Sequence, residues 1–186
     1  MVMAATQYHS ASMVRDLVSE TRHWPRYETV HGELLVSPAP RLWHQEIVGR
    51  LYEALRAYAR REPEVHVFMS PADISWGLPD VLVQPDVFVV PFNEARRMDW
   101  SAIGHLMLTA EVFSPGSLRA DRFTKRRLYQ ELRVPLYWGI DADARVVEIW
   151  TPDAVSPQLE HAALAWHPVG AASPFTFQLA ELFREI

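Results

Sequence analysis

The sequence has no cysteine among its 186 residues, which excludes a cysteine nucleophile, a cysteine-ligated zinc site and an iron–sulfur cluster. It has no run of 18 consecutive apolar residues, and it does not begin with a basic region followed by an apolar stretch. It therefore predicts neither a membrane span nor a signal peptide, and we expect a cytoplasmic protein with no membrane partner. The formal net charge of −5 argues against nucleic-acid binding by bulk positive charge, although a local basic patch remains compatible with it.

Lysine is almost absent as well. Of the 18 Lys and Arg residues, 17 are arginines, and Lys125 is the single lysine. Arginine stays protonated in proteins, whereas the pKa of a lysine responds to its surroundings. The solitary lysine fits a dedicated chemical role, and it also fits a codon bias that spared one lysine by accident.

The length and the 49% hydrophobic content suit a single domain with a sizeable core. We expect an N-terminal tail with a short helix over residues 1–25, followed by one domain over 26–186. A helix over 41–61 is predicted from apolar residues spaced i, i+3, i+4 along one face: Ile47, Val48, Leu51, Leu55 and Tyr58. A second helix is predicted over 118–133.

Strands are predicted between and after these helices, over 26–30, 33–37, 65–69, 73–76, 81–90, 105–113, 136–140, 145–150 and 175–179. The order of the elements is β, α, several β, α, β, β. This order is typical of an α/β (α+β) fold in which helices flank a mixed sheet.

Two acidic residues stand in strongly apolar surroundings. Glu111 lies inside the apolar run 106–113, where an unpaired carboxylate is costly, and Asp86 opens the apolar stretch 87–90. If these strands pair antiparallel, the two carboxylates meet at one sheet edge, where a divalent cation bound through oxygen stabilises them. The alternatives are a turn or cap role for Asp86 and a salt bridge to arginine for Glu111.

Lys125 is placed by helical spacing. On the helix predicted over 118–133, Asp121 and Lys125 fall at i and i+4 on the stripe that carries the leucines expected to pack on the sheet. The helix begins soon after Glu111, so Asp86, Glu111 and Lys125 are predicted to converge. The alternative is a simple ion pair between Lys125 and Asp121 within the helix.

The same helix carries a separate basic stripe formed by Arg119, Arg122, Arg126 and Arg127. Such a stripe contacts phosphates in a nucleic-acid-binding protein, and it is also typical of a solvated helix face.

A set of short motifs recurs in a familiar order: Gly32-Glu33-Leu34, His44-Gln45 at a helix start, Gln84-Pro85-Asp86-Val87, Glu111-Val112-Phe113-Ser114-Pro115-Gly116-Ser117, Asp121 with Lys125-Arg126, and Val134-Pro135-Leu136-Tyr137-Trp138. Their order and spacing over about residues 27–150 resemble the bacterial Uma-two family of "putative restriction endonucleases", within the PD-(D/E)XK nuclease superfamily.

The resemblance implies a restriction-endonuclease-like core and cleavage of phosphodiesters that depends on Mg²⁺ or Mn²⁺. It implies that Asp86 and Glu111 bind the metal, with Glu33 as a third ligand. The superfamily lysine usually follows the second acid by two residues, where this sequence has Phe113. The resemblance implies that Lys125 on the following helix replaces it.

Other residues also match the family pattern, and ordinary structural roles are the alternative to a functional one. His44 and Gln45 match a pair at the helix start, for which capping or surface contacts are the alternative, and Asp121 accompanies the lysine. Glu33 is alternatively an ordinary strand residue.

The leading hypothesis is therefore a Mg²⁺-dependent endonuclease that hydrolyses phosphodiester bonds of DNA, with Asp86, Glu111 and Lys125 at its centre. We expect a homodimer, because cutting both strands with one centre per chain favours two copies. The alternative is a noncatalytic, nuclease-like interaction or regulatory module. It agrees with the acidic net charge and with the lack of a separate DNA-reading domain. A two-carboxylate hydrolase of another substrate is a third option.

Overall fold

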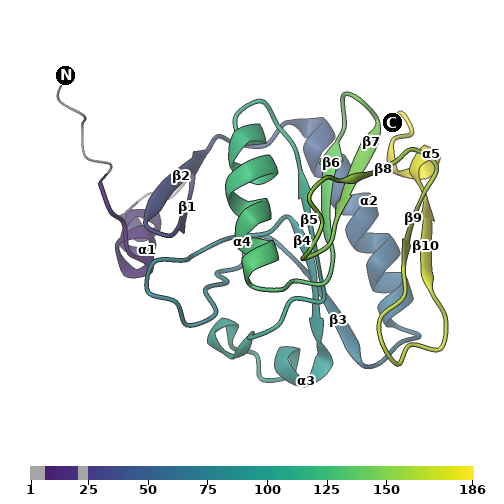
Figure 1. Ribbon diagram of the computed structural model, residues 1–186, viewed down its shortest axis with the longest axis horizontal. Coiled ribbons are helices and arrows are strands. Elements are labelled where there is room, and N and C mark those ends of the chain that lie inside the picture. Colours follow the sequence, from purple (N-terminus) through teal and green to yellow (C-terminus); the bar gives the residue numbers. More distant parts are fainter. Residues whose placement is uncertain (1–6, 21–24) are drawn as a thin grey trace.

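The computed structural model describes residues 7–20 and 25–186, so the parts of the expected N-terminal tail at 1–6 and 21–24 lie outside the described residues. At the centre is a six-stranded sheet with the order β3-β4-β5-β6-β7-β8 (Figure 1). Its strands are β3 (Val65–Met69), β4 (Val87–Pro91), β5 (Leu108–Val112), β6 (Tyr137–Asp141), β7 (Val146–Trp150) and β8 (Gln158–Glu160). Only β5 and β6 pair in parallel, so the sheet is mixed.

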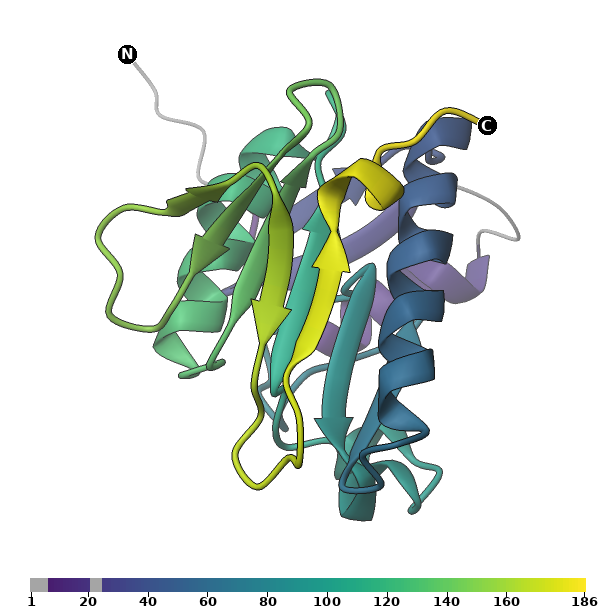
Figure 2. The ribbon, with the colours of Figure 1, turned by 90° about the vertical axis from the view of Figure 1, so that its right-hand side faces the viewer.

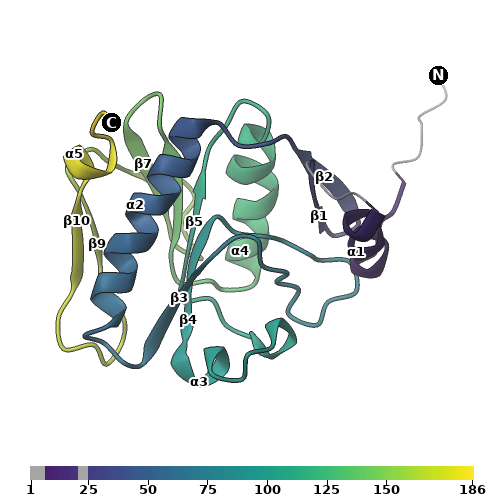
Figure 3. The ribbon, with the colours of Figure 1, turned by 180° about the vertical axis from the view of Figure 1, so that it is seen from behind.

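Helices cover both faces of the sheet. The long helix α2 (Leu42–Ala59) lies on one face, and a π-helix, η2 (Ala120–Lys125), continues into α4 (Arg126–Glu131) on the other. Figure 2 shows the sheet between these two layers, and Figure 3 shows α2 from its own side. The predicted α+β fold, a mixed sheet flanked by helices, is confirmed.

Smaller elements surround this core. They are α1 (Ala11–Glu20), β1 (Arg26–Val30), β2 (Glu33–Ser37), α3 (Phe92–Ala95), the 3-10 turn η1 (Trp100–Ala102), β9 (Ala163–Trp166), β10 (Phe175–Gln178) and α5 (Leu179–Leu182). In the described part of the chain, no helix is both long enough and apolar enough to cross a membrane.

Strand β5 carries the alternation that positions the site. All five of its residues are buried, and Leu108, Ala110 and Val112 join the core beneath α2. Because neighbouring strand residues point to opposite faces, Thr109 and Glu111 lie on the face covered by η2 and α4. The buried carboxylate of Glu111 therefore belongs to the layer between the sheet and the second helix.

The hairpin β1–β2 brings a second buried acid, Glu28 of β1, to the same layer. His31 and Gly32 both have positive φ, 50° and 79°, which suits the two-residue turn between these strands. Strand β1 joins the rest of the molecule through a bridge between Thr29 and Leu82. This contact places β1 beside the segment that leads into β4.

Two predicted strands are shorter than expected. The prediction over 73–76 is wrong except at Ile74, which forms one isolated bridge to Val83. The predicted strand 81–90 enters the sheet only at Val87. Leu82 pairs with Thr29 of β1, and Val83 pairs with Ile74. The strand-like part of the sequence before Val87 therefore lies outside the six-stranded sheet.

The second predicted helix also differs from expectation. The segment 118–133 does not form one α-helix, because its central part is the π-helix η2 and its regular part ends at Glu131. The C-terminal region contains two further short strands, β8 and β9, that hydrophobic patterning did not predict. The predicted helix over 41–61 is confirmed as α2, with the same five residues buried.

Gly139 in β6 provides a test of the packing on the η2 side. A Cβ at this position would lie 2.3 Å from Cζ of Phe113. We expect Gly139→Ala to lower the free energy of unfolding by about 1–3 kcal/mol, because the added methyl group overpacks a buried site. Gly49→Ala in α2 is the matched control, since its Cβ would meet nothing within 4 Å. It should stabilise the helix by about 0.5–1 kcal/mol. Urea denaturation measures both, and unchanged stability of Gly139→Ala would contradict the packing.

Candidate active site

Asp86 and Glu111 lie side by side, as the antiparallel pairing of their strands requires. Val87 of β4 faces Ala110 of β5, so the two acids occupy the next position in the register. Oδ2 of Asp86 accepts a hydrogen bond of 2.9 Å from the backbone N–H of Val112, and Oε2 of Glu111 accepts one of 3.4 Å from the N–H of Asp86. Both residues are buried, 3% and 1% exposed. The predicted meeting of these two carboxylates is present in the structure.

Lys125 lies at the centre of three carboxylates. Its Nζ atom is 3.0 Å from Oε1 of Glu28, 3.1 Å from Oε1 of Glu111 and 3.1 Å from Oδ1 of Asp121. An ammonium group carries three protons, so each carboxylate has one available to it. The ion pair with Asp121 that the helix spacing predicts is present, and the lysine also reaches acids on two other elements.

The wide turn of η2 supports this arrangement. Asp121 and Lys125 both lie in the π-helix and both are buried. The hydroxyl of Tyr129 donates a 2.8 Å hydrogen bond to Oε1 of Glu111, and the hydroxyl of Tyr137 donates a 3.0 Å bond to the carbonyl of Asp121. Short π-helical segments occur frequently at functional sites.

Asp86 is also held by two basic side chains. Nη1 of Arg26 lies 3.2 Å from Oδ1, and Nε2 of His44 lies 3.5 Å from Oδ2. Burial alone would raise the pKa of Asp86, but His44, Arg26 and Lys125 together lower this pKa well below its usual value. Asp86 is therefore ionised across the physiological pH range.

The acids around Lys125 behave differently. Burial raises the pKa of Glu111 well above its usual value, and the nearby acids Asp121, Asp86 and Glu28 add to the rise while Lys125 opposes it. Burial likewise raises the pKa of Asp121. Burial would lower the pKa of Lys125, but the three carboxylates raise it well above its usual value. One ammonium cannot neutralise three carboxylates, so the cluster holds a proton or attracts a further cation.

A small cleft opens beside these groups. Its volume is about 20 Å³, which is room for a water molecule or one small ion. The cleft is bordered by Asp86, Glu111, Asp121, Lys125, His44 and Ser117. Carboxylate oxygens are the ligands that Mg²⁺ prefers, and Mg²⁺ commonly uses one or two protein carboxylates together with water and substrate phosphate.

The donor set fits that mode of metal binding. Within residues 7–20 and 25–186, no group of three His, Cys, Asp or Glu side chains is arranged to hold a metal ion by itself. Three carboxylates, those of Asp86, Glu111 and Asp121, do border one small cleft. The residues therefore suit a magnesium ion that binds one or two protein carboxylates and keeps its other positions for water or phosphate.

The early acid of the cluster is Glu28 and not the expected Glu33. Glu33 pairs with Val30 in the hairpin and is exposed, and it does not border the cleft. Glu28 is 1% exposed, and its Oε1 accepts a 2.7 Å hydrogen bond from the N–H of Gln84. The hairpin register places both acids on one face, but Glu28 lies opposite Leu35 in the middle of the hairpin, where it is buried, whereas Glu33 lies beside the turn, where it is exposed. Strand alternation gives no signal for Glu28, because Glu28, Thr29 and Val30 are buried in succession.

The two residues expected at the helix start are also separated. His44 borders the cleft and contacts Asp86, whereas Gln45 is exposed and outside it. Successive residues on a helix point about 100° apart, so only one of the pair faces the site.

The structure divides the predicted arginine stripe. Arg122 forms a 2.8 Å ion pair with Glu148, and the guanidinium of Arg126 lies 4.4 Å from the ring centre of Trp150. Both are half-buried against β7 and are engaged within the protein. The two remaining members of the stripe are exposed to solvent, Arg119 and Arg127.

Removing the central ammonium tests this electrostatic picture. Lys125→Met should lower the free energy of unfolding by about 3–5 kcal/mol at neutral pH, because three buried carboxylates lose their counter-ion. The variant removes the ammonium that lowers the pKa values of Glu111 and Asp121, which burial already raises in the folded state, so this deficit should shrink as the pH falls and grow as it rises. Urea denaturation at about pH 5.5 and about pH 8 measures the difference.

A matched double variant sharpens that test. Glu28→Gln in the Lys125→Met background removes one of the uncompensated charges and keeps an oxygen that accepts from the N–H of Gln84. It should recover part of the lost stability at about pH 8. A deficit that is the same at both pH values, or that Glu28→Gln deepens, is inconsistent with an electrostatic origin.

Comparisons with known proteins agree with this architecture. A family model described as "Putative restriction endonuclease" matches residues 14–175. The structure also resembles the crystal structure of "a putative nuclease belonging to DUF820" from Anabaena variabilis, with a TM-score of 0.70 and 19% sequence identity. The match covers 91% of this chain and 96% of that chain, and at this identity it shows a shared fold. No curated protein matches the chain significantly. Because the family match spans most of the chain and every residue of the buried cluster, this protein belongs to the Uma2 family.

Proposed function

We propose that this protein is a Mg²⁺-dependent endonuclease that hydrolyses phosphodiester bonds of DNA. Its family and its fold support a nuclease function. The observation that carries the proposal is the placement of Asp86 and Glu111 on one small cleft, with the solitary lysine 3.1 Å from Glu111. Two ionisable carboxylates with different surroundings and an adjacent ammonium are the groups that metal-assisted phosphodiester hydrolysis uses.

Each residue has a definable task in this proposal. When bound, a magnesium ion supplies positive charge at the phosphate and lowers the pKa of a water molecule. Asp86 and Glu111 would hold the ion through their carboxylate oxygens. Lys125 and the hydroxyl of Tyr129 both bind Oε1 of Glu111, so they fix the orientation of this carboxylate and place positive charge at the edge of the cleft.

His44 and Glu28 position different groups of the site: His44 contacts Asp86, and Glu28 contacts Lys125. His44 and Arg26 contact different oxygens of Asp86 and hold that carboxylate in its ionised state. Glu28 binds Lys125 from the side of β1 and so positions the ammonium. In this proposal Glu28 replaces the expected Glu33 as the third acid of the centre.

The substrate and the assembly follow from charge and stoichiometry. Arg119 and Arg127 are exposed on the helix that forms one wall of the cleft, where they would contact neighbouring phosphates. Each chain holds one candidate centre. Cutting both strands of a duplex would therefore need two copies, and a homodimer stays a prediction.

The central test is metal-dependent cleavage of DNA by variants of the cleft. We expect Asp86→Asn and Glu111→Gln each to lower the rate of Mg²⁺-dependent cleavage by more than about 100-fold, because each removes a metal-binding charge. Glu28→Gln should lower the rate by about 10- to 100-fold through Lys125. Glu33→Gln is the matched control, an exposed acid on the neighbouring strand, and should cut as the unaltered protein does.

The readout is a gel of single-stranded and duplex DNA and of RNA incubated with Mg²⁺, with Mn²⁺ and with chelator. Circular dichroism confirms that each variant is folded. Equal cleavage by Asp86→Asn and the unaltered protein refutes the assignment of the centre.

A noncatalytic, nuclease-like module is the second candidate, and one observation favours it. Nζ of Lys125 lies 3.0–3.1 Å from oxygens of three carboxylates, so ion pairs already hold the buried cluster together without any ligand. Calorimetric titration with Mg²⁺ separates the two candidates. A module of this kind gives no cleavage of any nucleic acid at metal concentrations that saturate the site, whereas the endonuclease gives both metal binding and cleavage.

A further inference from the structure

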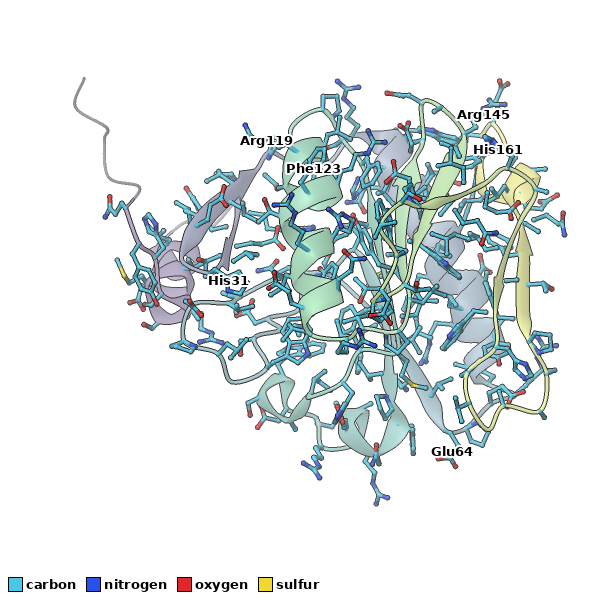
Figure 4. The ribbon with its side chains drawn as sticks, in the orientation of Figure 1. His31, Glu64, Arg119, Phe123, Arg145 and His161 are labelled. Atoms are coloured by element: carbon cyan, nitrogen blue, oxygen red, sulfur yellow. The ribbon has the colours of Figure 1, made fainter. Side chains whose placement is uncertain are left out.

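The outer face of the helix that forms one cleft wall carries an exposed aromatic ring between two arginines. Arg119, Phe123 and Arg127 follow one another at intervals of four residues, which places them along one side of the helix. All three are exposed, and half of the surface of Phe123 is accessible. Figure 4 shows Arg119 and Phe123 on the upper part of this helix, in the layer that lies in front of the sheet.

This outer face and the cleft lie on opposite sides of the same helix. Phe123 lies two positions from both Asp121 and Lys125, which border the cleft from the opposite side of the same helix. A ligand held by the outer face is therefore separated from the carboxylate pair by the width of the helix, about 10–12 Å.

The other two arginines of this helix, Arg122 and Arg126, contact side chains inside the protein. Arg122 is bound to Glu148 and stacks over the ring of Phe113 at 4.8 Å, and Arg126 lies over Trp150. The cationic groups that flank Phe123 on the solvent side are accordingly Arg119 and Arg127.

An exposed ring flanked by guanidinium groups matches the chemistry of an unpaired nucleotide strand. A nucleobase stacks on an aromatic ring through its π face, and the adjoining phosphates bind cations. In a duplex the base faces are covered by neighbouring base pairs, so a phenyl ring gains little from contact with it. Phenylalanine has no hydrogen-bonding group, so such stacking does not distinguish one base from another.

We propose that Arg119, Phe123 and Arg127 form a contact surface for single-stranded nucleic acid, and that this surface gives the adjacent cleft a preference for unpaired over duplex substrate. The inference rests on the proposed function, which makes nucleic acid the substrate. It adds the strandedness of that substrate and the residues that select it.

Binding of a fluorescein-labelled oligonucleotide tests the role of the ring. Fluorescence anisotropy in chelator, where metal-dependent cleavage does not consume the probe, gives the dissociation constant for a 20-nucleotide single strand and for its duplex. We expect Phe123→Ala to weaken single-strand binding by about 10-fold and duplex binding by less than about 2-fold. Phe123→Trp should retain the affinity, and Phe123→Leu should lose it, because leucine keeps the apolar bulk but has no ring to stack.

Phe92→Ala is the matched control, since Phe92 is 45% exposed but lies on α3, away from η2. It should bind both probes as the unaltered protein does. Unchanged single-strand affinity of Phe123→Ala overturns the inference. Equal weakening for both probes also overturns it, and retained affinity in Phe123→Leu indicates hydrophobic docking in place of stacking.

The salt dependence of binding tests the arginines separately. Each phosphate contact on a single strand contributes about 0.7 to the slope of log affinity against log salt. Arg119→Gln and Arg127→Gln should each lower that slope by about 0.7, whereas the exposed Arg97→Gln beyond α3 should leave it unchanged. Slopes that match the unaltered protein refute the phosphate contacts.

The two proposals fail in different ways. If Phe123→Ala loses neither affinity nor strand preference while the unaltered protein still cleaves with Mg²⁺, the endonuclease stands and this surface does not. If neither the unaltered protein nor its Phe123 variants bind or cut any probe, the nucleic-acid function itself is refuted.

Discussion

The rest of the structure depends on the ion pairs that the ammonium group of Lys125 forms with three buried carboxylates. This ammonium group joins Glu28 on β1 to Glu111 on β5 and Asp121 on η2, and β1 is distant in sequence from the other two elements. Without this counter-ion, the burial of three carboxylates beside Asp86 would be strongly unfavourable. With it, the cluster still has more negative than positive charge. The group that stabilises the fold therefore leaves a net negative charge beside the cleft.

The convergence of Asp86, Glu111 and Lys125 could be predicted from the sequence because the relevant periodicities are local. Strand alternation and antiparallel pairing placed Asp86 beside Glu111, and helical spacing placed Lys125 on the face that packs on the sheet. Glu28 could not be found in this way. Its inward position depends on the bridge between Thr29 and Leu82, a contact across more than 50 residues that no local pattern encodes. The same long-range pairing explains why the predicted strand 81–90 begins only at Val87.

The sides of one helix lie in three different environments, and only the tertiary structure distinguishes them. Asp121 and Lys125 face the cleft, Arg122 and Arg126 pack against residues of β7, and Phe123 faces solvent. From the sequence alone, the arginines of this segment form one undivided basic stripe. The partners that separate them, Glu148 and Trp150, belong to a strand that follows the helix in the chain, so their proximity is a consequence of the sheet order.

The negative net charge of the chain is weak evidence against nucleic-acid binding once burial is considered. Among the described residues, six acids are buried, Glu28, Glu62, Asp86, Glu111, Asp121 and Glu148, whereas Lys125 is the one buried basic residue. Much of the formal charge of −5 therefore lies inside the protein, where it acts on the cleft and not on an approaching polyanion. Exposed arginines such as Arg119 and Arg127 then determine the local potential at the helix surface. The acidic composition and a nucleic-acid substrate are compatible because four of the six buried acids, Glu28, Asp86, Glu111 and Asp121, belong to the candidate centre and do not face solvent.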